Sequence, residues 1–314
     1  MLAAKRMRGL LFIVGCSLTP TACRQERPSR VPDSAVVRTV PVPSAPTNIL
    51  PSPTWDQRTG SFFVVPASTA ESALVIFPEF TNDISIDSAH FDTDRAANST
   101  VMLTRDGEGV GSARLAKLVV EKVEDCPAWP RAQLVSTLPG QALPTDWGVG
   151  LVGSTTALRL AQLAHMSERD SARVTVVIAR LASGLADDTS TVFRGRPFVV
   201  RQVTTVHTER APFLFAEVVR TIDQEAMPLQ EHLTIIAEPD STQVGGYRVA
   251  YSERTTGTEE TVETTELLAA LAPDGETIQL LVSRELGEGV SYAVIAREGT
   301  RGWRVRWTSA YAGC

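Results

Sequence analysis

The sequence predicts a mainly β protein, with a minor α component, in which antiparallel sheets accompany one substantial helix near residues 167–186. Short runs of β-branched and aromatic residues recur from residue 61 onward, separated by Pro, Gly, Asn and Asp. Several of these runs alternate between apolar and polar residues, as half-buried strands do. One stretch instead repeats its apolar residues at helical spacing. Consecutive strands of this kind are expected to pair with their neighbours as a meander of hairpins.

The first folded part is expected to span residues 59–190 and to be rich in β-structure. Gly107, Gly109 and Gly111 lack the lysine and the spacing of a nucleotide-binding loop, so they predict a hairpin turn. Strands are expected at 62–65, 74–80, 101–105, 115–124 and 147–152.

The predicted helix begins at a capping box. Ser167 and Asp170 are placed to satisfy amide donors in the first turn. The apolar stripe that should face the core consists of Val174, Val177, Ile178, Leu181 and Leu185.

The second folded part, residues 191–314, is expected to be almost entirely antiparallel β. Turns are predicted at 287–289 and 299–302, where glycines interrupt the apolar pattern. The clearest strands are expected at 213–220, 247–251, 278–282, 292–296 and 303–307.

Within this part, the segment from Leu267 to Trp307 resembles a degenerate integrin-type (FG-GAP) repeat. It has an apolar segment, an Asp274-Gly275 turn, an aliphatic strand, Tyr292 and a closing Trp303. The family places calcium-binding aspartates before the glycine, whereas here Leu271-Ala272-Pro273 precede the turn. The resemblance therefore implies a repeat that has lost its calcium ligands.

The N-terminal residues 1–22 predict an export signal. A basic start with Lys5, Arg6 and Arg8 precedes an uncharged run over residues 9–18. This run is shorter than the ~20 apolar residues that a transmembrane helix needs. We therefore expect the segment to be recognised and removed rather than to span a membrane.

Two cysteines resemble the lipidated residue of bacterial lipoproteins. Ile13-Val14-Gly15-Cys16 fits the lipobox pattern, but it leaves a short apolar core. Pro20-Thr21-Ala22-Cys23 departs from the pattern at proline yet leaves a core of ordinary length. Cys23 is the preferred lipidation site and Cys16 the alternative; a plain signal peptide with a soluble mature protein also remains open.

Lipidation would give several acyl chains, such as palmitate, and hence a firm membrane anchor. Neither cysteine is followed by Asp, which in a Gram-negative cell would favour the outer membrane. Residues 23–58 are rich in proline and predict an extended, disordered tether between the anchor and the folded part. The membrane is thus the one partner that the sequence predicts, reached through N-terminal acyl chains.

The charge balance excludes partners that need a basic surface. Without the three basic residues of the signal, the chain carries 27 Lys and Arg against 36 Asp and Glu, a net charge of −9. Nucleic-acid binding is therefore not expected, and a charge-based contact with anionic lipid is equally disfavoured.

Cys126 and Cys314 are expected to form a disulfide. If Cys23 becomes the lipidated N-terminus, these two cysteines remain as a pair in an oxidising compartment. Such a bridge would stabilise the fold by about 5 kcal/mol in the chain-entropy model. Two reduced cysteines, or an intermolecular bridge, are the alternatives.

Motifs for catalysis or cofactor binding are absent from the sequence, so no catalytic residue and no cofactor are predicted. Several residues that could bind a divalent cation lie in one segment: Asp83, Asp87, His90, Asp92 and Asp94. A solvated acidic loop explains them equally well. The residues Glu225, Glu231 and His232 around Pro228 predict an exposed polar turn. A solvated strand face or short helix is expected for Glu259, Glu260, Glu263 and Glu266.

The sequence thus predicts an envelope-anchored lipoprotein with a non-catalytic binding or structural role. The alternative is an exported hydrolase or metal-dependent enzyme that uses the segment from Asp83 to Asp94 or the pair Glu231 and His232.

Overall fold

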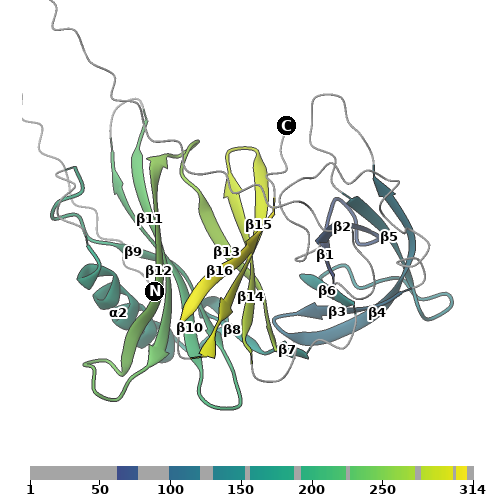
Figure 1. Ribbon diagram of the computed structural model, residues 1–314, viewed down its shortest axis with the longest axis horizontal. Coiled ribbons are helices and arrows are strands. Elements are labelled where there is room, and N and C mark those ends of the chain that lie inside the picture. The colour runs from purple at the N-terminus through teal and green to yellow at the C-terminus, as the bar shows by residue number, and fades with distance from the viewer. Residues whose placement is uncertain are drawn as a thin grey trace, which may run out of the picture. The chain divides into compact units, whose positions relative to one another are not determined.

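The computed structural model describes most of one compact unit, Asn48–Cys314 (Figure 1). The described residues are 62–76, 99–120, 130–152, 156–186, 192–223, 227–272, 277–299 and 302–309. Over these residues the chain is mainly β, with antiparallel sheets and one α-helix, so the predicted fold class is confirmed. Among the described residues, no helix has the length and hydrophobicity to cross a membrane. Several predictions lie outside the described residues: those for Cys16, Cys23, Cys126, Cys314, Glu225, Asp274-Gly275 and the acidic segment from Asp83 to Asp94.

The first six strands close into an antiparallel barrel. Its circular order is β1-β2-β5-β4-β3-β6. Alternate residues of β3 and β5 are buried, as expected for strands with one face turned into a barrel. Val64, Leu103, Leu115 and Leu134 fill the interior together with Trp147. The strands are β1 (Phe63–Pro66), β2 (Ser72–Ile76), β3 (Thr100–Arg105), β4 (Glu108–Val120), β5 (Pro130–Ser136) and β6 (Val149–Val152).

A two-residue turn joins β3 to β4. Asp106 and Gly107 have φ angles of 50° and 80°, as the tight turns of β-hairpins require. The predicted hairpin is therefore confirmed at Gly107, while Gly109 and Gly111 continue into strand β4.

The remaining strands form two five-stranded sheets. Sheet I has the order β12-β11-β10-β9-β8, and sheet II has the order β16-β15-β14-β13-β7. Each contains four consecutive strands in a meander plus one short strand at its edge, and the meander of hairpins predicted for the last three strands is the β14-β15-β16 part of sheet II. Sheet I consists of β8 (Leu160–Gln162), β9 (Val199–Val206), β10 (Phe213–Ile222), β11 (Leu229–Pro239) and β12 (Tyr247–Thr258). Sheet II consists of β7 (Thr156–Leu158), β13 (Thr264–Ala272), β14 (Gln279–Leu286), β15 (Gly289–Arg297) and β16 (Trp303–Thr308).

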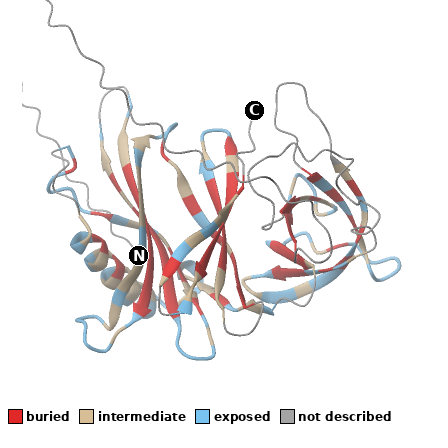
Figure 2. Ribbon diagram, viewed as in Figure 1, coloured by how far each residue is buried: buried red, intermediate tan, exposed pale blue. Residues whose placement is uncertain are grey.

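The two sheets pack face to face as a sandwich. Phe215 and Ile236 of sheet I meet Leu280, Ile295 and Trp303 of sheet II in one apolar cluster. The outer face of sheet II packs against the barrel through a second cluster, which includes Leu281 of the sheet and Leu151 of the barrel. Both faces of sheet II are therefore covered, and the central strands are buried along most of their length (Figure 2).

The other face of sheet I is covered by helix α2 (Glu168–Gly184), which follows the short 3-10 helix η1 (Leu163–His165). Ser167 caps α2 as predicted: the backbone N–H of Asp170 donates to its hydroxyl oxygen at 3.2 Å. The Ser167 hydroxyl also donates to the Asp170 carboxylate at 2.7 Å. Ile178 and Ala182 are buried in one apolar cluster with residues of β9, β10 and β11, so the predicted apolar stripe does face the core.

Candidate functional site: a polar cleft in the sandwich

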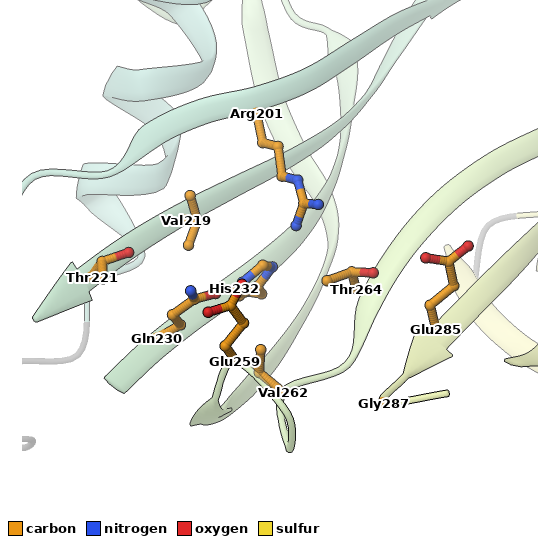
Figure 3. Close-up of a pocket in the computed structure, with 10 residues that line it drawn as sticks. All are labelled: Arg201, Val219, Thr221, Gln230, His232, Glu259, Val262, Thr264, Glu285 and Gly287. Carbon is orange, nitrogen blue, oxygen red and sulfur yellow. Dashed lines mark hydrogen bonds between the residues drawn. The ribbon is translucent and has the colours of Figure 1, made fainter. Parts of the chain in front are cut away.

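A cleft of about 400 Å³ opens between the two sheets where β10 and β14 end. Residues of both sheets and of two connecting turns line it (Figure 3). They are Arg201, Val219, Thr221, Gln230, His232, Glu259, Val262, Thr264, Glu285 and Gly287.

Strand alternation explains why polar side chains gather here. Successive side chains of a strand point to opposite faces, so Glu217 shares the inward face of β10 with Phe215, which belongs to the core between the sheets. Across the strand pair, Val219 lies opposite His232. The same faces that build the apolar core thus carry polar groups at the end of the sandwich.

A buried hydrogen-bonded row forms the floor of the cleft. His232 is only 3 % exposed, and its Nδ1 lies 2.9 Å from the Glu217 carboxylate. Its Nε2 lies 2.8 Å from the side-chain amide of Gln230. The backbone N–H of Thr265 in sheet II also donates to Glu217, at 3.2 Å. Glu217 is itself 3 % exposed, so these partners supply the hydrogen bonds that a buried carboxylate needs.

The walls of the cleft carry charges of both signs. The Arg201 side chain is half-exposed, and its Nε lies 3.6 Å from the second oxygen of Glu217. Glu259 and Glu285 are exposed acids that line the same cleft. Partial burial, and then the charges of Glu285 and Glu217, raise the pKa of the neighbouring Glu266 carboxyl, while Arg201 acts in the opposite direction.

The prediction of an exposed polar turn at Glu231 and His232 is wrong. Both residues lie in strand β11 and are buried, at 2 % and 3 % exposure. They point to opposite faces of sheet I, so they do not act together. The short sequence separation from Pro228 suggested a turn, but β11 begins immediately after that proline, at Leu229. Glu259 and Glu260 do lie in an exposed turn, whereas Glu263 is half-buried and Glu266 is exposed on β13.

Glu231 belongs to a separate buried ion-pair network on the helix side of sheet I. It accepts hydrogen bonds from Arg220 and Arg254. Arg220 also donates to the carbonyl oxygen of Phe193 at 3.1 Å, and its guanidinium stacks 4.8 Å from the ring centre of Phe198. These contacts fix the segment before β9 against the sheet, so we assign them a structural role.

The cleft offers hydrogen bonds and charge rather than an activated base. Both ring nitrogens of His232 are engaged by protein side chains, so the ring presents neither nitrogen to a substrate in this arrangement. Within the described ranges, no group of three or more His, Cys, Asp or Glu residues could hold a metal ion. The candidate metal ligands from Asp83 to Asp94 lie outside those ranges.

An adjoining cavity of about 670 Å³ shares Glu259 and Gly287 with the cleft. Its other lining residues are Met227, Pro228, Thr258, Glu260 and Glu288. Because Glu259 and Gly287 line both, the cleft and this cavity lie beside the β12–β13 and β14–β15 turns.

Sequence reasoning missed five of the polar residues that build this site: Arg201, Glu217, Gln230, Thr264 and Glu285. One of them left a detectable signal. Glu217 interrupts the apolar run from Phe213 to Val219, and a charged residue inside such a run requires a buried partner. That signal predicts a polar network but does not say which strand supplies its other members.

A scan of protein-family models found no match to this chain, and neither did searches of curated proteins and of solved structures.

Proposed function

We propose that this chain is an exported lipoprotein of a bacterial cell envelope, whose folded part binds a small ligand in the cleft and does not act as an enzyme. The pattern of residues 1–22 supports export, and Cys23, or alternatively Cys16, supplies the lipidation site. The Pro-rich residues 23–58 would hold the folded part away from the membrane. In a Gram-negative cell, the anchored protein would then lie at the outer membrane or the periplasmic face.

The geometry of His232 carries the non-catalytic part of this proposal. A general base must reach the proton that it removes, yet Glu217 and Gln230 occupy both ring nitrogens. The volume of the cleft, about 400 Å³, lies within the ~300–1,000 Å³ typical of small-molecule sites. Its mostly polar lining favours a polar or charged ligand.

The full chain, purified from membranes in detergent, provides the test. We expect no turnover across a broad panel of ester, peptide, glycoside and phosphate substrates, with and without added divalent cations. The panel should be repeated with His232→Ala and, as a matched control in the exposed turn, with Glu260→Gln. Turnover that His232→Ala abolishes and Glu260→Gln retains would replace this proposal with the exported hydrolase or metal-dependent enzyme.

A further inference from the structure

The cleft presents ionic groups of opposite sign from the two sheets. Arg201 comes from β9 of sheet I, and Glu285 comes from β14 of sheet II. Glu259 approaches from the turn between β12 and β13. Figure 3 shows the Arg201 guanidinium above His232, the Glu259 side chain overlapping His232 in this view, and the Glu285 carboxylate beyond Thr264.

Arg201 has donor capacity to spare. Its one ion pair is the 3.6 Å approach of Nε to Glu217, a distance at which the attraction is ionic without a hydrogen bond. Its terminal nitrogens have no hydrogen-bond partner among the residues that the structure describes. A guanidinium in this state can receive a carboxylate through two parallel hydrogen bonds.

The acids on the facing wall also lack partners. Neither Glu259 nor Glu285 forms a side-chain hydrogen bond or ion pair with any described residue. Glu285 also acts on Glu266, whose pKa is raised first by burial and then by the charges of Glu285 and Glu217. A positive group beside Glu285 would offset part of this repulsion.

We propose that the cleft binds a zwitterion of the amino-acid type, either a free amino acid or a dipeptide. Its carboxylate would pair with Arg201, and its ammonium group would lie between Glu259 and Glu285. A simple anion would leave the two acids without a counter-charge, and a simple cation would leave the terminal nitrogens of Arg201 without an acceptor. This inference rests on the proposed binding function and names the chemical class of its ligand.

The test uses the detergent-purified full chain and a defined set of probes. The twenty free L-amino acids and L-alanyl-L-alanine are screened by thermal shift, and the strongest binder is titrated by calorimetry. We expect at least one probe to raise the melting temperature. Capping that probe as its N-acetyl derivative or as its C-terminal amide should weaken binding by about tenfold, because either Arg201 or the two acids then lose the opposite charge of the ligand.

Two variants assign each charge to a wall of the cleft. Arg201→Gln should weaken binding of the unmodified probe and remove most of the penalty for amidation, while the penalty for acetylation remains. Glu285→Gln should weaken binding of the unmodified probe and remove most of the penalty for acetylation, while the penalty for amidation remains. Glu260→Gln, which does not line the cleft, should bind as the wild-type chain does.

The outcomes separate this inference from the function on which it rests. If no probe binds, or if the wild-type chain binds capped and uncapped probes equally, zwitterion recognition is wrong and the non-catalytic, exported protein stands. If a probe binds with the expected selectivity but is chemically converted, zwitterion recognition stands and the non-catalytic function is wrong.

Discussion

Glu217, Arg220, Glu231 and His232 are ionisable side chains buried in the neighbouring strands β10 and β11. Moving such groups out of water is costly unless hydrogen bonds and opposite charges compensate. Here the alternation of the strands separates them into two networks. Glu217 and His232 support the cleft, and Arg220 and Glu231 face the helix.

The Arg220–Glu231 pair offers a direct test of this compensation. Both side chains are at least 98 % buried, so Glu231→Gln should destabilise the fold by about 3 kcal/mol or more, because it leaves a buried guanidinium without its counter-charge. The double variant Arg220→Met, Glu231→Met should recover part of the loss. Urea unfolding measures both effects, with Glu259→Gln as an exposed control. A Glu231→Gln midpoint equal to that of the control would contradict this expectation.

Glu266 should make stability depend on pH. Because its pKa is raised in the folded protein, the native carboxyl holds its proton to a higher pH than the unfolded one does. The stability from this group is complete below the ordinary pKa of 4.5 and is lost as pH rises through the folded pKa. Glu266→Gln should therefore raise the urea midpoint at pH 7 and leave it nearly unchanged near pH 4. An equal effect at both pH values would show that charge is not the cause.

At the scale of single elements, the β3–β4 hairpin depends on one glycine. Gly107 has φ of 80°, and a Cβ at this position would overlap the carbonyl group of Leu158 in β7. Gly107 therefore permits both the tight turn and the close approach of strand β7.

Gly107→Ala should lower the free energy of unfolding by about 1–2 kcal/mol from the left-handed backbone alone, and further from the overlap. The matched control is Gly109→Ala, because a Cβ at Gly109 meets no atom within 4 Å. Chemical denaturation compares the two. Equal stabilities of these variants would mean that the turn at Gly107 tolerates a side chain.

The sequence predicted helix α2 from its periodicity but missed strand β11. Helix α2 was recognisable because Ile178 and Ala182 face the core while Arg173 and Arg180 face away. Strand β11 was missed because residues 231–238 are buried on both faces, and a strand covered on both sides shows no alternation. Strands β14 and β15 are also covered on both faces, so their prediction depended on β-branched and aromatic residues between glycine turns rather than on a contrast between two faces.

The candidate site was harder to predict for a different reason. Its members come from β9, β10, β11, β13 and β14, and only the packing of sheet I on sheet II brings them together. Glu217 and Thr265 are far apart in the sequence, yet their hydrogen bond joins the two sheets. Composition and local motifs carry no information about such contacts, and the sequence pattern instead directed attention to the neighbours Glu231 and His232.

At the scale of the whole folded unit, shared apolar clusters connect its layers. Leu151 of the barrel and Leu281 of sheet II belong to one cluster, and Phe215 and Leu280 join the two sheets in another. Sheet II thus contributes to the core on both of its faces. We expect this continuity to make the barrel and the sandwich unfold together.

Tryptophan fluorescence can test this cooperativity. Trp147 lies in the barrel core and Trp303 in the core between the sheets. Two variants, each keeping one of these two residues and carrying Trp→Phe at the other four positions, should give coincident urea transitions. Two separated midpoints would show that the barrel and the sandwich are independent domains.

The proposal that the chain is exported and held at a membrane by N-terminal acyl chains has one most direct test. Cells expressing the full chain are labelled with a fatty-acid probe and fractionated, and the wild type is compared with Cys23→Ser and Cys16→Ser. We predict a labelled, membrane-bound protein that loses its label in Cys23→Ser and keeps it in Cys16→Ser, or the reverse if Cys16 is the lipidated residue. An unlabelled cytosolic protein that retains Met1 would contradict the proposal.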